Sequence, residues 1–117
     1  MSMANEEIPP QLVEKINRFN QLRQTLEAVI MQRQQIQADM KETQTALGEL
    51  NALSDESKVY TIVGKLLIMK DKQTVSKELS EKIELLKLRD SSLERQESKL
   101  REKFKELQEE LSSSLAS

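Results

Sequence analysis

Leucine recurs every seven residues through the second half of this chain, at Leu79, Leu86, Leu93, Leu100 and Leu107. A helix under-wound to about 3.5 residues per turn returns every seventh residue to one stripe, so this spacing is typical of a coiled-coil seam. The first half carries a similar repeat as two lines, one of Leu12, Phe19, Leu26, Met40 and Leu47, the other of Leu22, Val29, Ile36 and Leu50. The repeats predict two long helices, over residues 11–53 and 73–112, that pack as an antiparallel coiled coil.

The bulk composition excludes several functional classes. Acidic and basic residues are interspersed and the net charge is −2, so the basic footprint of a nucleic-acid-binding protein is missing. No apolar run approaches the roughly 20 residues that a membrane span needs, and residues 1–10 lack the features of a signal peptide. The absence of cysteine excludes disulfides and favours a cytoplasmic protein. We therefore expect neither nucleic-acid nor membrane partners.

The stretch between the two helices has the composition of β-strands. Residues 59–63 are mostly β-branched and residues 66–69 are all apolar, with Gly64 and Lys65 between them. Glycine in the first position of a two-residue connection suits a type II′ turn. The sequence therefore predicts a β-hairpin over residues 59–69 with the pairs Val63–Leu66, Ile62–Leu67, Thr61–Ile68 and Tyr60–Met69.

Such a hairpin is too apolar to be stable by itself. Both faces would be largely apolar, and an isolated two-stranded hairpin is marginal in water. Its bare edges would also invite pairing with another chain. We therefore expect it to be buried by other subunits, through Val59, Tyr60, Ile62, Val63, Gly64, Leu66, Leu67, Ile68 and Met69.

Polar residues interrupt the two seams. If the hairpin lies beside Leu50 and Leu79, facing residues of the antiparallel helices have numbers that add to about 130. Arg33 then comes near Glu97, with Asp90 one or two turns away. We expect an Arg33–Glu97 pair that fixes the register at some cost in stability. The alternative is that these charges extend out of the seam unpaired.

The apolar stripe changes phase near the two chain ends. Leu22 follows Phe19 after three residues, and Lys15 occupies a seam position. A two-stranded coil buries one narrow stripe, so we expect a partly exposed apolar patch that binds other proteins. The alternatives are a frayed coil end or a seam continued by a neighbouring subunit. The candidate residues are Ile8, Leu12, Val13, Ile16, Phe19, Phe104, Leu107, Leu111 and Leu115.

The sequence offers no constellation for catalysis. Histidine is absent, which removes the commonest general base and a common metal ligand. Neither Gly48 nor Gly64 lies in a phosphate-binding loop. We therefore expect no enzyme activity, cofactor or metal. The tripeptide Lys70-Asp71-Lys72 is interpreted as a solvated exit from the hairpin, with Asp71 or Thr74 as the N-cap of the second helix.

Three segments resemble beta-class prefoldin subunits of the archaeal type. Residues 59–68 are similar to that family's insert, in which a strand with a Val-Tyr pair leads to a glycine turn and an apolar second strand. The opening Ile8-Pro9-Pro10-Gln11 and the later stretch Leu93-Glu94-Arg95-Gln96-Glu97 are similar as well. A single hairpin, in place of two, favours the beta class over the alpha class.

The resemblance implies an ATP-independent chaperone subunit. Prefoldin hexamers combine two alpha and four beta subunits whose hairpins assemble into β-barrels between subunits. Their coiled-coil tips bind unfolded proteins and transfer them to a group II chaperonin. Carried onto this chain, residues 59–69 are the assembly element and the apolar patch holds clients. Charged residues near the tips either dock the chaperonin or only solvate the helices: Lys15, Arg18, Lys103, Glu109 and Glu110.

A second hypothesis keeps the same fold and changes the function. In that hypothesis the chain is a coiled-coil structural adaptor whose ends bind one specific folded partner. The two hypotheses differ in promiscuity, because a chaperone binds many unfolded sequences and an adaptor binds one folded surface.

Overall fold

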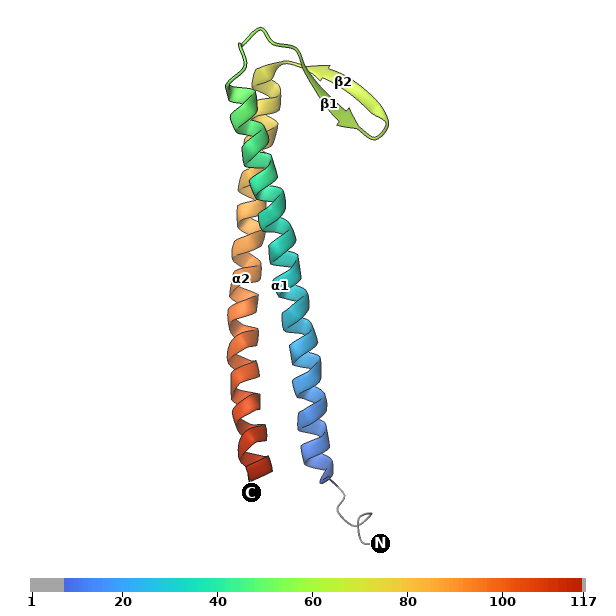
Figure 1. Ribbon diagram of the computed structural model, residues 1–117, viewed down its shortest axis with the longest axis vertical. Coiled ribbons are helices and arrows are strands. Elements are labelled where there is room, and N and C mark those ends of the chain that lie inside the picture. Colours follow the sequence, from blue (N-terminus) through green and yellow to red (C-terminus); the bar gives the residue numbers. More distant parts are fainter. Residues whose placement is uncertain (1–7, 117) are drawn as a thin grey trace. The chain divides into compact units, whose positions relative to one another are not determined.

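The computed structural model describes residues 8–116. Most of the segment 1–10, for which no signal peptide is expected, therefore lies outside the described residues, as does residue 117. The elements in chain order are α1 (Pro10–Asn51), β1 (Val59–Val63), β2 (Leu66–Lys70) and α2 (Lys72–Ala116), as Figure 1 shows. The predicted class, mainly α with two long helices joined by a single β-hairpin, is confirmed. Neither described helix is both long and apolar enough to cross a membrane.

The chain divides into two compact units, and each contains part of both helices. Within the described residues, the terminal unit comprises 8–32 and 93–116, and the hairpin unit comprises 33–92 with both strands. Inside each unit the α1 and α2 segments run side by side in opposite directions (Figure 1).

Two prolines set the start of α1. Pro10 is its first residue, and the Pro9 carbonyl oxygen accepts hydrogen bonds from the Leu12 and Val13 amides at 2.9 and 3.1 Å. Proline suits this position because its fixed φ is already helical and its missing N–H has no intrahelical partner there. The helix therefore begins where the chain leaves this dipeptide.

Each unit has a narrow core in which five of the eight buried apolar residues lie on the predicted heptad lines, whereas Val75, Ile83 and Leu111 do not. In the terminal unit the buried apolar residues are Leu26, Val29, Leu107 and Leu111, and in the hairpin unit they are Leu50, Val75, Ile83 and Leu86. Thr43 is also buried, at 4% exposure, at a seam position where an apolar residue is the usual choice. Its hydroxyl donates to the Asp39 carbonyl oxygen at 2.7 Å, so the buried polar group is satisfied within α1.

The start of α2 is capped by Asp71. Its Oδ1 accepts a hydrogen bond from the Thr74 amide at 2.7 Å, which is the geometry of an N-cap side chain. A hydrogen bond with the Thr74 side chain, and after it this bond from the Thr74 amide, lower the pKa of the Asp71 carboxyl group below its ordinary value. Of the two N-cap candidates, the structure selects Asp71.

The β-hairpin has the predicted register. β1 and β2 pair antiparallel with Val63 opposite Leu66, Ile62 opposite Leu67, Thr61 opposite Ile68 and Tyr60 opposite Met69, and the ladder continues to Val59 and Lys70. Gly64 has a φ of 61°, and no described non-glycine residue has a positive φ. A positive φ at the first turn residue alone distinguishes type II′ from type I′, which needs it at both residues.

The seam register differs from the predicted one by a heptad. In the hairpin unit Arg33 faces Asp90, and in the terminal unit the rings of Phe19 and Phe104 stack with centroids 4.6 Å apart. The residue numbers of both facing pairs add to 123, not to about 130. A shift of seven residues brings the same heptad positions back together, so the apolar pattern cannot distinguish the two alignments. The contacts do.

Candidate protein-interaction sites

The two faces of the hairpin differ in how much of them is covered. Because side chains alternate along a strand, Tyr60, Ile62, Leu67 and Met69 share one face, named here the bare face. All four are exposed, from 54% for Tyr60 to 78% for Ile62. On the opposite face Val59, Thr61 and Lys70 are half-buried, although Val63, Leu66 and Ile68 are exposed. The bare face is therefore wholly apolar apart from the tyrosine hydroxyl.

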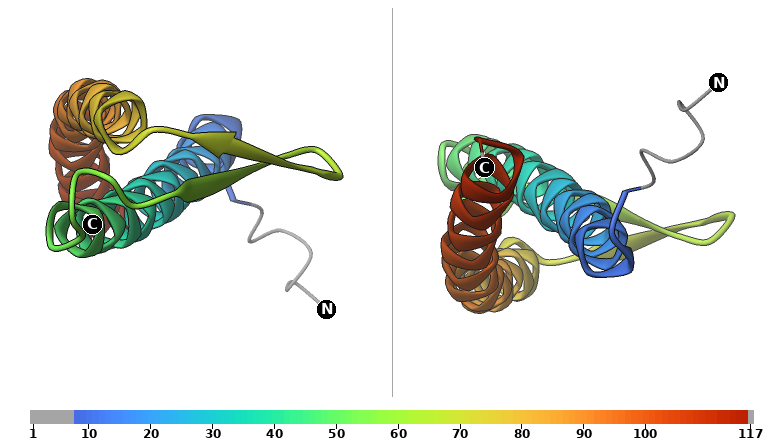
Figure 2. Two further views of the ribbon diagram at one scale, coloured as in Figure 1. Left: turned by 90° about the horizontal axis from the view of Figure 1, so that it is seen from above. Right: turned by 90° about the horizontal axis from the view of Figure 1, so that it is seen from below.

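The hairpin extends away from the helix ends to which it is joined, as the end-on views in Figure 2 show. At its root the Lys70 ammonium contacts both carboxylate oxygens of Glu78 at 2.8 and 3.1 Å, which connects the end of β2 to α2. An exposed apolar sheet of two strands is an interaction surface by the ordinary criterion of contiguous apolar area.

The predicted patch near the chain ends is only partly exposed. Ile8, Val13 and Leu115 are exposed, at 54%, 40% and 70%. Four further candidates are half-buried: Leu12, Ile16, Phe19 and Phe104. Leu107 and Leu111 are buried in the core of the terminal unit, so their side chains stabilise the helix pair and contribute little to the exposed patch. The exposed part of the patch therefore consists of Ile8, just before α1, and of residues in the outermost turns of α1 and α2.

Charged residues surround the terminal unit's apolar positions. The Lys15 ammonium lies 3.9 Å from a Glu110 carboxylate oxygen, between side chains that are 36% and 58% exposed. A shallow groove of about 500 Å³ lies between the two helices and contains both signs of charge together with two leucines, its lining being Arg18, Gln21, Leu22, Thr25, Lys103, Glu106, Leu107 and Glu110. Glu109 lines a second shallow hollow beside Lys15. Exposed pairs of this kind contribute little to stability and keep the surface hydrated.

The Arg33 guanidinium makes a two-pronged contact with Asp90. Nε donates to Oδ1 at 2.9 Å and Nη2 donates to Oδ2 at 3.3 Å, between side chains that are 19% and 18% exposed. These hydrogen bonds lower the pKa of the Asp90 carboxyl group, against the smaller opposite effect of its burial. Glu97 lies in the terminal unit, where Arg101 donates to it at 2.8 Å, and the predicted Arg33–Glu97 pair across the two units stays a prediction.

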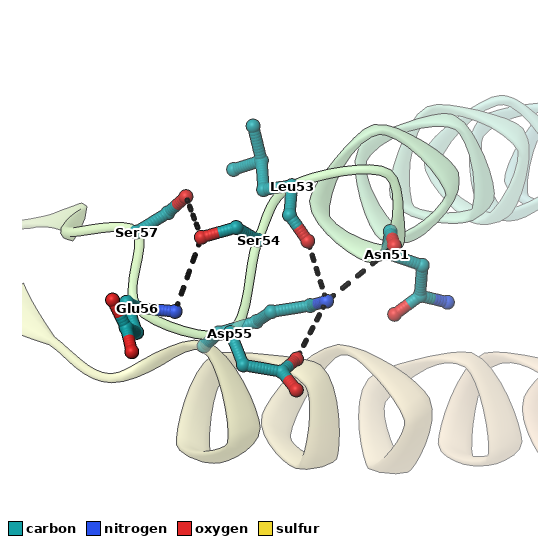
Figure 3. Close-up of polar contacts among 7 residues, drawn as sticks. Asn51, Leu53, Ser54, Asp55, Glu56 and Ser57 are labelled. Atoms are coloured by element: carbon teal, nitrogen blue, oxygen red, sulfur yellow. Dashed lines mark hydrogen bonds and ion pairs between the residues drawn. The ribbon is translucent and has the colours of Figure 1, made fainter.

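Sequence reasoning missed the role of Lys72. Its ammonium donates to the Leu53 carbonyl oxygen at 2.7 Å, to Asp55 Oδ1 at 3.1 Å and to the Asn51 carbonyl oxygen at 3.4 Å. Figure 3 shows the three acceptors converging at the end of α1. The prediction of a solvated exit at Lys70-Asp71-Lys72 is therefore wrong, because the side chains of all three residues form hydrogen bonds with neighbouring elements. A signal was available, because α1 ends without a glycine or a basic residue in its last turn.

No group of acidic residues that could hold a metal ion occurs within residues 8–116. The features that these residues do provide are an exposed apolar β-hairpin and a coiled coil with apolar outer turns. Together they define a class of interaction proteins in which two long helices carry a β-hairpin for association.

A sequence profile described as "Prefoldin subunit" matches residues 13–117, and the chain belongs to this family, whose members are chaperone subunits. Proteins named prefoldin subunit beta are similar over most of their length. The one from Archaeoglobus fulgidus is 44% identical over 94% of this chain and 95% of its own, and the one from Pyrococcus abyssi is 40% identical over 94% of both.

Solved structures place the likeness in the beta class. The crystal structure of the prefoldin beta subunit from Thermococcus strain KS-1 superposes with a TM-score of 0.84 at 40% identity, covering 94% of this chain and 96% of that one. The prefoldin beta2 subunit from the same strain gives a TM-score of 0.55 at 26% identity, over 84% and 97%. The resemblance to beta-class prefoldin found in the sequence is confirmed.

Proposed function

We propose that this chain is a cytoplasmic, ATP-independent co-chaperone subunit. It assembles through its β-hairpin with alpha-class prefoldin subunits, in a hexamer of two alpha and four beta chains whose hairpins form β-barrels. Its terminal unit captures unfolded proteins and transfers them to a group II chaperonin. The observation that carries the proposal is the bare face of the hairpin, on a chain that belongs to the prefoldin subunit family.

The state of the hairpin supports assembly. A two-stranded sheet with apolar residues on both faces loses free energy when those faces leave water, at about 25 cal/mol per Å² of apolar area. Ile62, Leu66 and Leu67 are each at least 66% exposed, so most of this gain is still available to a partner. The outer edges of β1 and β2 also offer unpaired backbone groups to further strands.

The terminal unit supports client binding by different means. Its exposed apolar residues make the first contacts: Ile8 lies just before α1, and Val13 and Leu115 lie in the outer turns of the helices. The half-buried residues Leu12, Ile16, Phe19 and Phe104 add the exposed part of their side chains to this surface. Each contact is weak, and several arms holding one client raise the overall affinity through effective concentration.

Aggregation assays test the proposal. The chain is mixed with an alpha-class prefoldin subunit, and the complex is added to several unrelated chemically denatured proteins without nucleotide. We expect suppression of aggregation for most of them, and a higher refolding yield when a group II chaperonin and ATP follow. Native mass measurement of the complex gives the subunit ratio in the same samples.

The adaptor hypothesis makes the opposite prediction. Protection of no denatured protein, with tight binding to one folded partner, would support an adaptor. Failure to form any complex with an alpha-class subunit would contradict the assembly half of the proposal, whatever the client assay shows.

A further inference from the structure

The last turn of α1 is closed by backbone hydrogen bonds from the Ala52 amide to the Gly48 and Glu49 carbonyl oxygens, at 3.3 and 3.2 Å, and from the Leu53 amide to the Leu50 carbonyl oxygen at 3.1 Å. No glycine or basic residue of its own caps the carbonyl groups that remain. A helix leaves its last carbonyl groups without intrahelical partners, and a following glycine or a basic residue in the last turn commonly satisfies them. Neither is present at the end of α1, where Ala52, Leu53 and Ser54 follow Asn51. The Asn51 and Leu53 carbonyl oxygens instead accept hydrogen bonds from Lys72, 21 and 19 residues further along the chain.

The Lys72 side chain is well placed for this task. It is 13% exposed, although lysine is normally a surface residue, and its ammonium has all three donors engaged. A cation at the C-terminal end of a helix is favoured by the helix dipole, and hydrogen bonds from a charged donor are stronger than neutral ones. The three acceptors therefore offset the cost of removing the ammonium group from water.

The loop before β1 has few other attachments. The hydrogen bonds within residues 54–57 are local to Ser54. Its hydroxyl accepts from the Glu56 amide at 3.3 Å and from the Ser57 hydroxyl at 3.5 Å (Figure 3), and its carbonyl oxygen accepts from the Ser57 amide at 3.0 Å. Asp55, 77% exposed, is the loop side chain that reaches Lys72. Lys72 thus connects the segment that precedes β1 to the start of α2, which follows β2.

We propose that Lys72 is a positioning residue for assembly, which holds the hairpin in one orientation so that its bare face meets a partner subunit. The inference rests on the proposed function for the identity of that partner. Lys72 acts together with its neighbours, because Lys70 ties β2 to Glu78 and Asp71 caps α2. Without Lys72 the β2–α2 connection is still held, and the α1–β1 connection becomes free to move.

The first measurement reports orientation and needs no partner. The chain contains no cysteine, so Lys65→Cys in the turn and Ala46→Cys on the exposed side of α1 give one spin-labelled pair inside the hairpin unit. In the Lys72→Met variant, which keeps the length of the side chain and removes its charge, we expect the distance distribution to broaden about twofold. Lys72→Arg should keep most of the narrow distribution, and Lys77→Met, at an exposed position of α2, should not change it.

The second measurement reports assembly with an alpha-class prefoldin subunit. Lys72→Met should weaken binding about tenfold, which corresponds to the loss of charge-assisted hydrogen bonds. A stability-matched control separates positioning from general destabilisation: Val29→Ala, in the core of the terminal unit, lowers the melting temperature and should leave assembly unchanged.

The outcomes separate the two proposals. An unchanged distance distribution in Lys72→Met overturns the positioning role, and so does a broadened distribution with wild-type assembly. Equal losses of assembly in Lys72→Met and Val29→Ala also overturn it, since stability alone would then explain both. If the wild-type chain does not bind an alpha-class subunit but Lys72→Met broadens the distribution, the proposed function fails and the orienting contact stands.

Discussion

The hairpin and the outer turns of the terminal unit both leave apolar side chains uncovered, but on backbones of different kinds. Ile62 and Leu67 lie opposite each other in a sheet whose register is set by one turn, so their spacing is fixed. Val13 and Leu115 lie in the outer turns of separate helices, and no described sheet or turn ties their spacing. A fixed apolar surface selects a partner of matching shape, whereas an adjustable one accepts many sequences. The same chemistry therefore suits assembly in one place and promiscuous capture in the other.

The largest expected effect tests whether the bare face of the hairpin is the assembly surface. Ile62→Asp places a charge on the bare face, where assembly would remove it from water, so we expect binding to an alpha-class subunit to weaken about a thousandfold. Native mass measurement at micromolar concentration reports the loss. Leu88→Asp is the matched control, because Leu88 is 69% exposed in the same unit and lies outside the hairpin. Equal losses in both variants would contradict a specific hairpin interface.

The next effect tests which leucines form the core. Leu107→Ala removes a side chain that is 6% exposed, so we expect the free energy of unfolding to fall by about 2–3 kcal/mol. Leu67→Ala, at 66% exposure in the hairpin, should change it by less than about 0.5 kcal/mol in the isolated chain. Urea unfolding followed by circular dichroism measures both. A small effect at Leu107 would place that leucine in the exposed patch.

A third prediction concerns the pH dependence of the hairpin unit. The pKa of Asp90 is lowered in the folded state, so its contribution to stability is present above the ordinary value of 3.8 and is lost as the pH falls through the folded value. At pH 7 we expect Asp90→Asn to be less stable than the wild type by about 1 kcal/mol, because a half-buried two-pronged pair is lost. Urea unfolding at pH 7 and pH 2.5 should show the difference shrinking in acid.

The control for this experiment is an exposed pair. Glu27→Gln removes the contact with Arg23, whose side chain is 50% exposed, and should cost less than about 0.5 kcal/mol at either pH. A difference between Asp90→Asn and wild type that stays constant with pH would show that the contact does not depend on the ionised carboxylate.

A fourth prediction is that alanine substitutions at the two glycines change stability in opposite directions. A methyl group added at either position meets no atom within 4 Å, so backbone conformation alone decides the result. Gly64 has φ at +61°, and Gly64→Ala should destabilise the hairpin by about 1 kcal/mol. Gly48 is helical, and Gly48→Ala should stabilise the chain by about 0.5–1 kcal/mol. Amide exchange in the hairpin and thermal melting measure the two effects, and equal signs would contradict the assigned turn.

The smallest expected effect concerns the terminal unit. Leu115→Asp removes one adjustable apolar contact among several, so we expect suppression of client aggregation to fall about two- to fivefold with assembly intact. Leu88→Asp is again the control, since the two leucines are 70% and 69% exposed. Equal losses of client protection would show that apolar area alone, and not its place in the terminal unit, determines capture.

The hairpin was predictable from sequence down to its residue pairs. Gly64 and Lys65 define a two-residue turn, and a turn of that length and type leaves one register for residues 59–63 and 66–69. The exposed apolar surface of the hairpin was also predictable, because nearly every paired residue is apolar and two strands alone cannot cover both faces. The heptads predicted only part of the core, because Val75 and Ile83 are buried outside the predicted leucine line and Leu111 was assigned to the exposed patch.

The interhelical register and the contacts of Lys72 were not predictable in this way. Heptad patterns match again after seven residues, and choosing between Asp90 and Glu97 as the residue facing Arg33 needs the loop path between the helices. The acceptors of Lys72 include backbone carbonyl groups, which every residue carries, so no side-chain pattern identifies them. The burial of Thr43 was not predicted, because a polar residue does not mark a seam position in the heptad pattern. Its hydroxyl is satisfied within its own helix and needs no partner on α2.

Asp71 and Lys72 serve two helices at once: the acidic side chain lies at the start of α2 and the basic one at the finish of α1. Each helix end thereby receives the sign that its aligned peptide dipoles favour. Transposing these two letters would preserve composition, net charge and length, yet would place the wrong sign at both ends. The order of these two neighbouring residues, which composition does not record, therefore determines whether each helix end receives the favourable charge.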